Sequence, residues 1–306
     1  MAANNSLVPY DFFQQDVKLI IVQVLIMIFL CINFLLIVTF FKKQCFHGTA
    51  RYILFAVTLL SDSLLLFLSN ILVILSTFKI TIHVWVCVII SVPALLYTTV
   101  TPVTLTAMTL ERYVAICMPL RHGELCSTRR TVYCILIIHG LSFIPCTVIF
   151  SIFFASASLS FYKQHHLCAV EIFDIWQSHL RTAIYQLQFL IMCIIIVCSY
   201  VKIMKVAKAA SGENKKLTTK GLKTVVLHGF QLLLCLIQLW CPFIEANPYF
   251  SSFKHVRYIN YIMFYLAPKC LSPLIYGIRD ECFFNALKIY ASFGTYKRNV
   301  IEKFEK

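Results

Sequence analysis

The chain has 306 residues, of which 60% are hydrophobic and 13% are charged, whereas an average soluble domain is about 45–50% apolar and about 25% charged. A soluble fold could not bury so many apolar side chains, so the composition indicates a membrane protein. The formal net charge of +14 would otherwise suggest a nucleic-acid-binding protein, and this class is excluded if the charge lies where a membrane places it.

Apolar stretches long enough to cross a membrane follow one another along the chain. A helix needs about 20 residues to cross about 30 Å of hydrocarbon. The stretches without Asp, Glu, Lys or Arg are residues 19–41, 80–110, 131–162, 182–201 and 224–244. Two further apolar stretches hold one charge each, Asp62 within 52–78 and Lys269 within 258–278. Together they predict an all-α membrane protein, a bundle of seven transmembrane helices.

The positive charges indicate how these spans are oriented. Basic residues favour the cytoplasmic side, and with the N-terminus outside, the inner segments hold 20 of the 27 Lys and Arg residues. The predicted organisation is an extracellular tail over residues 1–18, a membrane domain over 19–278 and a cytoplasmic segment over 279–306. The excess charge then orients the chain and attracts anionic lipid headgroups, so no nucleic acid is required.

Each terminal segment carries one recognisable feature. The N-terminal tail contains a glycosylation acceptor, Asn4, in the pattern Asn-x-Ser. Residues 279–290 mix charges with apolar side chains such as Phe283 and Leu287 at helical spacing. This pattern predicts a short amphipathic C-terminal helix that lies on the inner leaflet.

Two of the 14 cysteines differ from the others in position. Cys87 lies at the outer start of the third span, and Cys168 lies in the long outer loop between the fourth and fifth spans. In an oxidising compartment these thiols can form a disulfide that ties the loop over the bundle, and two free thiols are the alternative. Most other cysteines lie within apolar spans, where they are expected to be core residues.

The two charges inside the membrane lie at a similar depth. Asp62 is about 16 Å, and Lys269 about 14 Å, above the inner end of its span. Charged residues in the membrane usually face the bundle interior and pair, so we expect a buried ion pair. The alternative is that Lys269 faces a water-filled cavity or a ligand.

The end of the third span shows the first specific motif. Arg112 follows Cys87 by 25 residues, or about 37 Å of helix, which places it at the inner membrane surface. On spacing alone it could be an arginine that extends its head group to the surface. Its neighbours, however, form the sequence Glu111-Arg112-Tyr113, continued as Val-Ala-Ile-Cys-Met-Pro-Leu.

This motif and several others resemble those of rhodopsin-like (class A) G-protein-coupled receptors, and within that group the odorant receptors. The remaining matches, in chain order, are Asn33, Asp62, Tyr200, Trp240-Cys241-Pro242 and Ser272-Pro273-Leu274-Ile275-Tyr276. The resemblance covers nearly all of residues 19–290. The second span lacks the Pro-Met-Tyr opening usual in tetrapod odorant receptors, and the whole chain is most similar to the fish odorant receptors. Ser272 stands where these receptors usually have asparagine.

The resemblance implies a receptor in the plasma membrane of an olfactory sensory neuron, with its N-terminus outside. It would bind a small water-soluble odorant and activate a heterotrimeric G protein, of the stimulatory olfactory type that raises cAMP. The residues expected to carry activation and coupling are Glu111, Arg112, Tyr113, Tyr200, Trp240, Pro242, Pro273 and Tyr276. For the aromatic residues among them, simple core packing is the alternative.

The resemblance also implies roles for residues inside the bundle. It places Asp62 in a sodium-binding pocket that Lys269 would line, so we expect the ammonium group to replace the cation and make the receptor insensitive to sodium. The expected ligand pocket is mostly apolar with a few hydroxyls and amides. Its residues are Ala94, Leu95, Thr98, Thr99, Tyr185, Gln188, Phe243, Asn247, Ile262 and Tyr265. Arg181 and Arg257 near its rim could attract an anionic odorant, or pair with acidic neighbours.

Other classes of protein are less compatible with the sequence. A non-olfactory receptor of the same fold, for another small ligand, is the main alternative. A channel or transporter is disfavoured by the odd number of spans and the lack of inverted halves. An enzyme is not expected, because the chain has no Walker loop, HExxH or GxSxG motif, and no cofactor or metal is predicted.

Overall fold

A computed structural model describes most of the first five spans and part of the remainder. The described residues are 7–43, 46–156, 158–168, 174–209, 219, 222–223, 225–227, 229–235, 237, 258–271 and 284–285. Side chains are described from residue 17 in the first helix and from residue 183 in α7.

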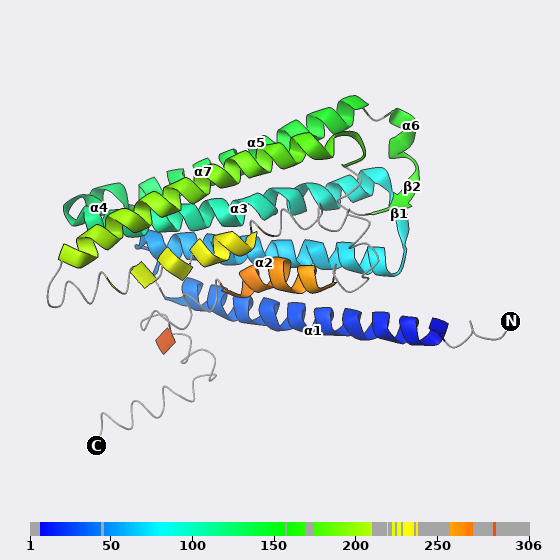
Figure 1. Cartoon of the computed structure of the whole chain (residues 1–306), viewed down its shortest axis with the longest axis horizontal. Coiled ribbons are helices and arrows are strands. Elements are labelled where there is room, and N and C mark those ends of the chain that lie inside the picture. The colour runs from blue at the N-terminus through cyan, green and yellow to red at the C-terminus, as the bar shows by residue number, and fades with distance from the viewer. Residues whose placement is uncertain are drawn as a thin grey trace, which may run out of the picture.

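Long helices that lie side by side dominate this part of the chain (Figure 1). They are α1 (Leu7–Lys42), α2 (Ala50–Thr77), α3 (Val84–Cys117), α5 (Thr128–Ser156) and α7 (Asp174–Ala209). Shorter elements are α4 (Pro119–Leu125), α6 (Leu159–Tyr162), the strands β1 (Thr81–His83) and β2 (His165–Leu167), and the π-helix η3 (Tyr261–Leu266). Successive long helices run in opposite directions, as expected for a chain that crosses a membrane repeatedly.

The five long helices are each apolar and long enough to span a membrane, among the residues that the structure describes. Many large apolar side chains on their outer faces are exposed, for example Met27, Leu136 and Leu187. A helix can present such side chains to lipid because it satisfies its own backbone hydrogen bonds. A shorter apolar helix over Val225–Cys235 lies within the expected sixth span.

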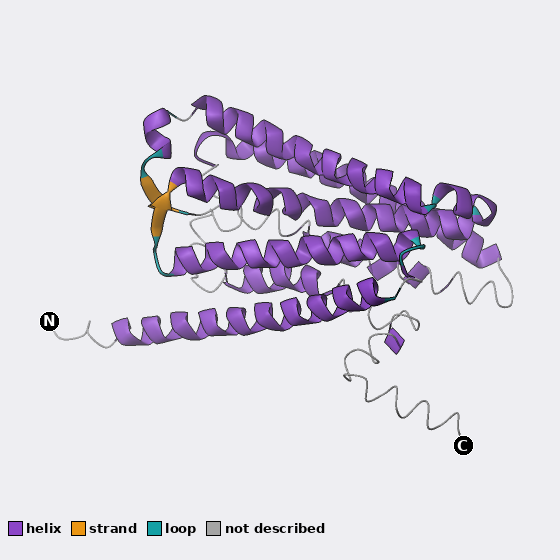
Figure 2. Ribbon diagram, turned by 180° about the vertical axis from the view of Figure 1, so that it is seen from behind, coloured by secondary structure: helices purple, strands orange, loops and turns teal. Residues whose placement is uncertain are grey.

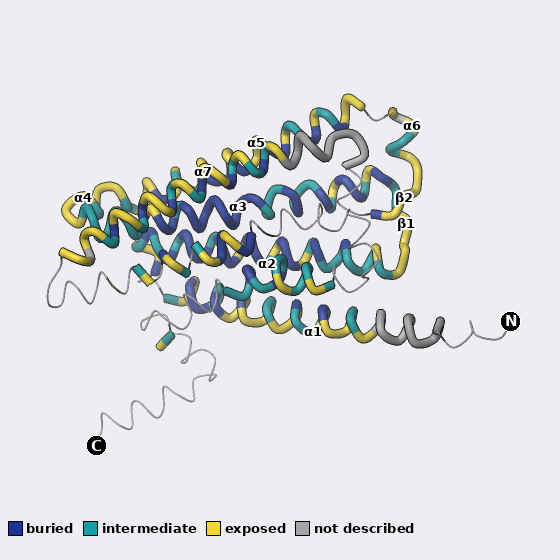
Figure 3. The backbone as a smooth tube through the Cα atoms, viewed as in Figure 1, coloured by how far each residue is buried: buried dark blue, intermediate teal, exposed yellow. Residues whose placement is uncertain are grey.

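Helix α3 forms the centre of the bundle, where it contacts α2, α5 and α7. It is largely buried along its length (Figure 3). Its Val100, Leu105 and Met108 pack in one cluster with Phe55 of α2 and Phe189 of α7. Such a position requires side chains that can be buried on all sides.

Several buried side chains of the central helix are threonines, whose polar hydroxyl groups form hydrogen bonds within the helix and not with water. The hydroxyls of Thr104, Thr106 and Thr109 donate to the carbonyl oxygens of the residues four positions earlier, at 2.7, 2.9 and 2.9 Å. Because each buried hydroxyl proton is used within its own helix, the desolvation cost of these groups is largely offset.

Polar contacts also join neighbouring helices. Gln23 of α1 donates to Oδ1 of Asn70 in α2 at 2.6 Å, and Asn33 donates to Oγ of Ser63 at 3.2 Å. Between the helices of the expected sixth and seventh spans, Nε2 of Gln231 donates to the Pro268 carbonyl at 2.8 Å. Hydrogen bonds of this kind contribute about 0.6–2 kcal/mol each to helix association in membranes.

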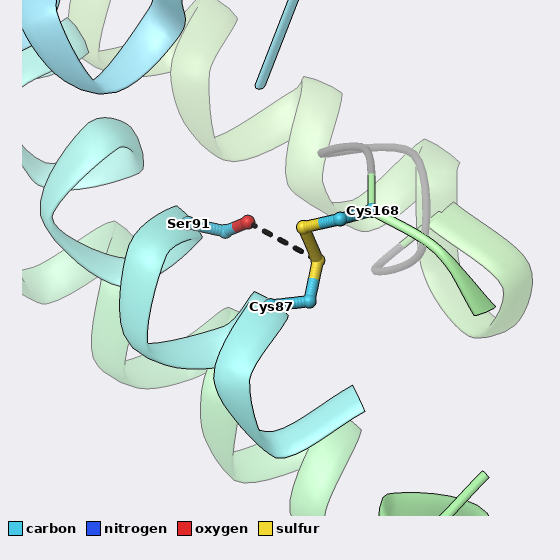
Figure 4. Close-up of a disulfide and its surroundings, with 3 residues drawn as sticks. All are labelled: Cys87, Ser91 and Cys168. Carbon is cyan, nitrogen blue, oxygen red and sulfur yellow. Dashed lines mark hydrogen bonds between the residues drawn. A yellow bond between two sulfur atoms is a disulfide. The ribbon is translucent and has the colours of Figure 1, made fainter. Parts of the chain in front are cut away.

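A small antiparallel sheet closes one end of the bundle (Figure 2). β1 pairs with β2 so that His83 faces His165. Cys168 follows β2 directly, and it is bonded to Cys87 in the first turn of α3, with 5.4 Å between their Cα atoms. Both cysteines are buried, and Ser91 lies one turn further along α3 (Figure 4). The predicted disulfide is confirmed.

The boundaries of several expected segments differ from the structure. α1 begins at Leu7, so the expected tail over 1–18 is helical from residue 7, although the segment that can span a membrane begins at Val17. The third helix begins at Val84 and not at residue 80, because residues 81–83 pair with β2. α5 ends at Ser156, within the expected fourth span, because the chain then turns into α6 and β2.

Two expected features fall on residues that the structure does not describe. One is the glycosylation acceptor Asn4. The other is the amphipathic C-terminal helix, of whose segment 279–306 only residues 284–285 are described, as helical.

We predict that Cys87→Ser and Cys168→Ser lower cell-surface expression equally, and that the double variant is no worse than either. Each change removes the same bond, and loss of a disulfide typically costs about 2–5 kcal/mol. Flow cytometry of a tagged chain measures the effect, with Cys31→Ser as the control because that thiol is free and exposed. Additive losses in the double variant would contradict the prediction.

Candidate functional site

A buried ion pair lies inside the bundle, between α2 and the helix that follows η3. Nζ of Lys269 is 3.0 Å from Oδ1 of Asp62, and the two side chains are 3% and 0% exposed. Thr101 of α3 completes a triangle. Its hydroxyl donates to the same Asp62 oxygen at 2.7 Å, and Nζ of Lys269 donates to the threonine oxygen at 3.2 Å.

The triangle compensates charges that would be costly alone. A single charge at the centre of a membrane costs at least about 2.5–3.5 kcal/mol on insertion scales. Here each charged group has its oppositely charged partner and the Thr101 hydroxyl within hydrogen-bonding distance.

The sequence indicated the shared depth of Asp62 and Lys269 but did not single out Thr101. Thr101 lies 11 residues before Arg112, or about 16 Å along the helix. This spacing alone would have placed it at the same membrane depth as Asp62.

The backbone before Lys269 departs from regular α-helix. Residues Tyr261–Leu266 form the π-helix η3, and α-helix resumes over residues 267–271. π-Helical turns are rare and occur often at functional sites. The extra residue in such a turn rotates the side chains that follow it, here including Lys269, relative to an uninterrupted helix. No pattern in the sequence indicated this turn.

A second polar cluster lies at the opposite end of α3 from the disulfide. Oε2 of Glu111 is 3.6 Å from Nε of Arg112, and Oε1 of Glu111 is 3.2 Å from Nε2 of His122 in α4. Glu111 is only 8% exposed. The carboxylate is therefore shared between the arginine beside it and a histidine that sequence reasoning missed.

Three further features of this end bear on its chemistry. Burial raises the pKa of the Cys126 thiol, and the nearby Glu111 carboxylate raises it further, so this cysteine is held as the unreactive thiol. Leu120 of α4 is 99% exposed. Tyr113 is partly buried, with Nζ of Lys202 at 5.7 Å from the centre of its ring.

A small cavity lies between α3, α7 and the helix over 225–235. The residues that line it are Thr98, Thr99, Pro102, Tyr185, Gln188, Phe189, Met192 and Cys235. Four of these, Thr98, Thr99, Tyr185 and Gln188, belong to the expected ligand pocket. The sequence prediction did not include the other four, which are Pro102, Phe189, Met192 and Cys235.

The remaining expected pocket residues with described side chains do not line this cavity. Ala94 packs with Cys87 and Cys168 beneath the sheet, and Leu95 packs with Tyr185 and residues of α5. Tyr265 stacks on Tyr261 with 5.0 Å between ring centres, and Ile262 packs beside them against α1 and α2. Of the expected pocket residues with described side chains, four therefore line the cavity and the other four pack against neighbouring helices outside it.

Other expected site residues lie outside the described part of the chain. They are Trp240, Pro242, Phe243, Asn247, Pro273 and Tyr276. Tyr200 is described and lies partly buried on α7. Within the described residues, no three His, Cys, Asp or Glu side chains gather so that they could hold a metal ion.

Comparisons with known proteins give one family and several relatives. The profile of the 7 transmembrane receptor (rhodopsin family) matches residues 32–276. Odorant receptor 131-2 of Danio rerio is 42% identical over 284 residues, which cover 91% of this chain and 87% of that receptor. Galanin receptor 2a of Danio rerio is 27% identical over 214 residues, or 64% of this chain and 55% of that receptor. Olfactory receptor 51V1 of Homo sapiens is 24% identical over 198 residues, or 58% of this chain and 57% of that receptor.

We predict that Lys269→Met destabilises the protein by about 3–5 kcal/mol, because it leaves the Asp62 carboxylate without its cation. The double variant Asp62→Asn with Lys269→Met should recover much of this loss. Thermal unfolding in detergent measures the effect, with Asp62→Asn completing the double-mutant cycle. If the double variant loses the sum of both single losses, the two side chains do not stabilise one another.

We also predict that sodium does not change the potency of an agonist at this protein, because Nζ of Lys269 already lies 3.0 Å from Oδ1 of Asp62, next to the carboxylate that a sodium ion would need. Dose–response curves in sodium chloride and in equimolar choline chloride should coincide. Lys269→Ala removes the built-in cation and should introduce a sodium dependence. A sodium-dependent shift in the unaltered protein would refute this interpretation of the pair.

Proposed function

The chain belongs to the rhodopsin family of seven-transmembrane receptors, and on this basis we propose that it is an odorant receptor of the plasma membrane. It binds a small water-soluble odorant inside the helical bundle and activates a stimulatory G protein that raises cAMP. The observation that carries the proposal is the similarity to a fish odorant receptor along nearly the whole chain. As a multi-pass membrane protein of a receptor family, the chain is not an enzyme.

The ends of the bundle suggest its orientation. The disulfide and the small sheet lie at one end, and α4 lies at the other (Figure 1). Disulfides persist in oxidising, extracellular surroundings, and most basic residues lie in the segments on the α4 side. We therefore place the sheet and the N-terminus outside the cell and α4 in the cytoplasm.

Glu111 and Arg112 supply the switch in this proposal. At rest, the carboxylate of Glu111 holds the guanidinium of Arg112 and the imidazole of His122. Ligand binding shifts the helices that surround α3, which frees Arg112 to contact the G protein. Leu120 stands almost fully exposed beside this cluster, and contact with a protein partner would remove that apolar side chain from water.

The terminal segments complete the proposal. Residues 279–306 form an amphipathic helix and tail on the inner leaflet, where basic side chains attract anionic lipid headgroups. Asn4 carries an N-linked glycan on the extracellular tail.

A receptor for a different small ligand is the second candidate function. The similarity to Galanin receptor 2a supports a receptor outside olfaction, but it covers a smaller part of the chain at lower identity. We therefore prefer the odorant receptor.

We predict that Arg112→Ala abolishes odorant-evoked cAMP in cells that express a stimulatory olfactory G protein, because the guanidinium makes the contact that activates it. Surface expression should stay within about two-fold, since Arg112 lies at the inner end of the bundle, away from the buried ion pair. Arg130→Ala is the matched control, because this exposed arginine makes only a surface ion pair with Glu124. A cAMP response that survives in Arg112→Ala would contradict G-protein coupling through this motif.

A further inference from the structure

The cavity between α3 and α7 carries no formal charge on the residues described as lining it. These are threonine, proline, tyrosine, glutamine, phenylalanine, methionine and cysteine side chains. A carboxylate or ammonium group in this cavity would lose its hydration without meeting an opposite charge, which costs far more than burying a neutral polar group. The wall therefore favours a neutral ligand.

Each threonine hydroxyl in the cavity wall already donates its proton to a backbone carbonyl. Thr98 donates to the carbonyl of Ala94 at 2.8 Å, and Thr99 donates to the carbonyl of Leu96 at 2.8 Å. A hydroxyl has one proton and two lone pairs. Towards a ligand, each threonine can thus offer only an acceptor.

Gln188 adds a third acceptor, and this one lacks a partner. Its Oε1 atom is buried and makes no hydrogen bond, in a side chain that lines the cavity. A buried carbonyl oxygen without a donor costs about 1–3 kcal/mol. A donor on the ligand would remove that cost, so this oxygen favours a ligand that can donate.

We propose that the ligand is a neutral hydroxyl compound, an aliphatic alcohol or a phenol, whose O–H group donates to Oε1 of Gln188. This inference rests on the proposed function and names the chemical class of the odorant. The apolar part of the ligand packs against Pro102, Phe189 and Met192, which surround the polar group in the same cavity. The cavity has a volume of about 20 Å³, which is enough for the hydroxyl group, so the side chains that line it must shift to admit the carbon chain.

Gln188 is then the residue that determines specificity. Its replacement by methionine keeps the length and the apolar packing of the side chain but removes the acceptor. Its replacement by glutamate keeps an acceptor oxygen and adds a negative charge, which would pair with an ammonium ligand.

The test measures cAMP in cells against matched probes of equal chain length. These are n-hexanol, methyl pentyl ether, hexanoate and n-hexylamine, with phenol and anisole as an aromatic pair, and the aliphatic series extended from butyl to octyl. In the unaltered receptor the alcohols should be more potent than the ethers, acids and amines. Gln188→Met should lower alcohol potency about ten-fold or more and leave the ether responses unchanged.

Gln188→Glu provides a result that misfolding cannot imitate. This variant should keep its response to n-hexanol and gain a response to n-hexylamine. Surface expression of each variant is measured in parallel to correct the responses for receptor number.

The outcomes separate this inference from the proposed function. If ethers, acids or amines are the most potent probes, or if Gln188→Met weakens alcohols and ethers equally, the hydroxyl class is wrong while odorant reception stands. Hexanoate as the most potent probe would instead favour an anionic odorant. If no probe raises cAMP and none stabilises the purified receptor against heat, the proposed function fails together with the inference.

Discussion

The arrangement of the inner bundle depends on the requirement that charges in a membrane interior be compensated by other protein groups. Asp62, Thr101 and Lys269 meet this requirement together, and they come from three separate segments. None of the three helices can rotate or slide far without leaving a charge uncompensated, which is costly in hydrocarbon. The triangle therefore fixes how α2, α3 and the helix after η3 face one another.

The central helix contributes residues to the cavity, to the triangle and to the inner cluster, in that order along its length. Thr98 and Thr99 line the cavity, Thr101 completes the ion-pair triangle, and Glu111 and Arg112 form the cluster at the inner end. From Thr98 to Arg112 is about 21 Å of continuous helix. One continuous helix, which contains Pro102, thus connects the cavity to the triangle and to the inner cluster.

The outer end of the same helix is held by covalent chemistry. The bond between Cys87 and Cys168 and the pairing of β1 with β2 hold the long outer loop against the start of α3. The inner end is held by weaker contacts, with α4 attached through Glu111 and His122. The end of the bundle at the sheet is therefore held covalently, whereas the end at α4 is held by weaker contacts.

Much of this protein could be determined from its sequence, because several signals are local. Hydropathy located the first five spans, and the order of motifs indicated the family that the comparisons confirm. The orientation that charge counting indicates stays a prediction. The shared depth of Asp62 and Lys269 follows from helical rise along the chain. The placement of Cys87 and Cys168 at the same end of the bundle follows from the order of spans and loops. Thr98, Thr99, Tyr185 and Gln188 of the expected pocket line one cavity, and their role in ligand binding stays a prediction. Tertiary structure alone revealed Thr101, His122, the other four cavity residues and the π-helical turn, because these depend on how each helix is rotated against its neighbours, which no local pattern encodes.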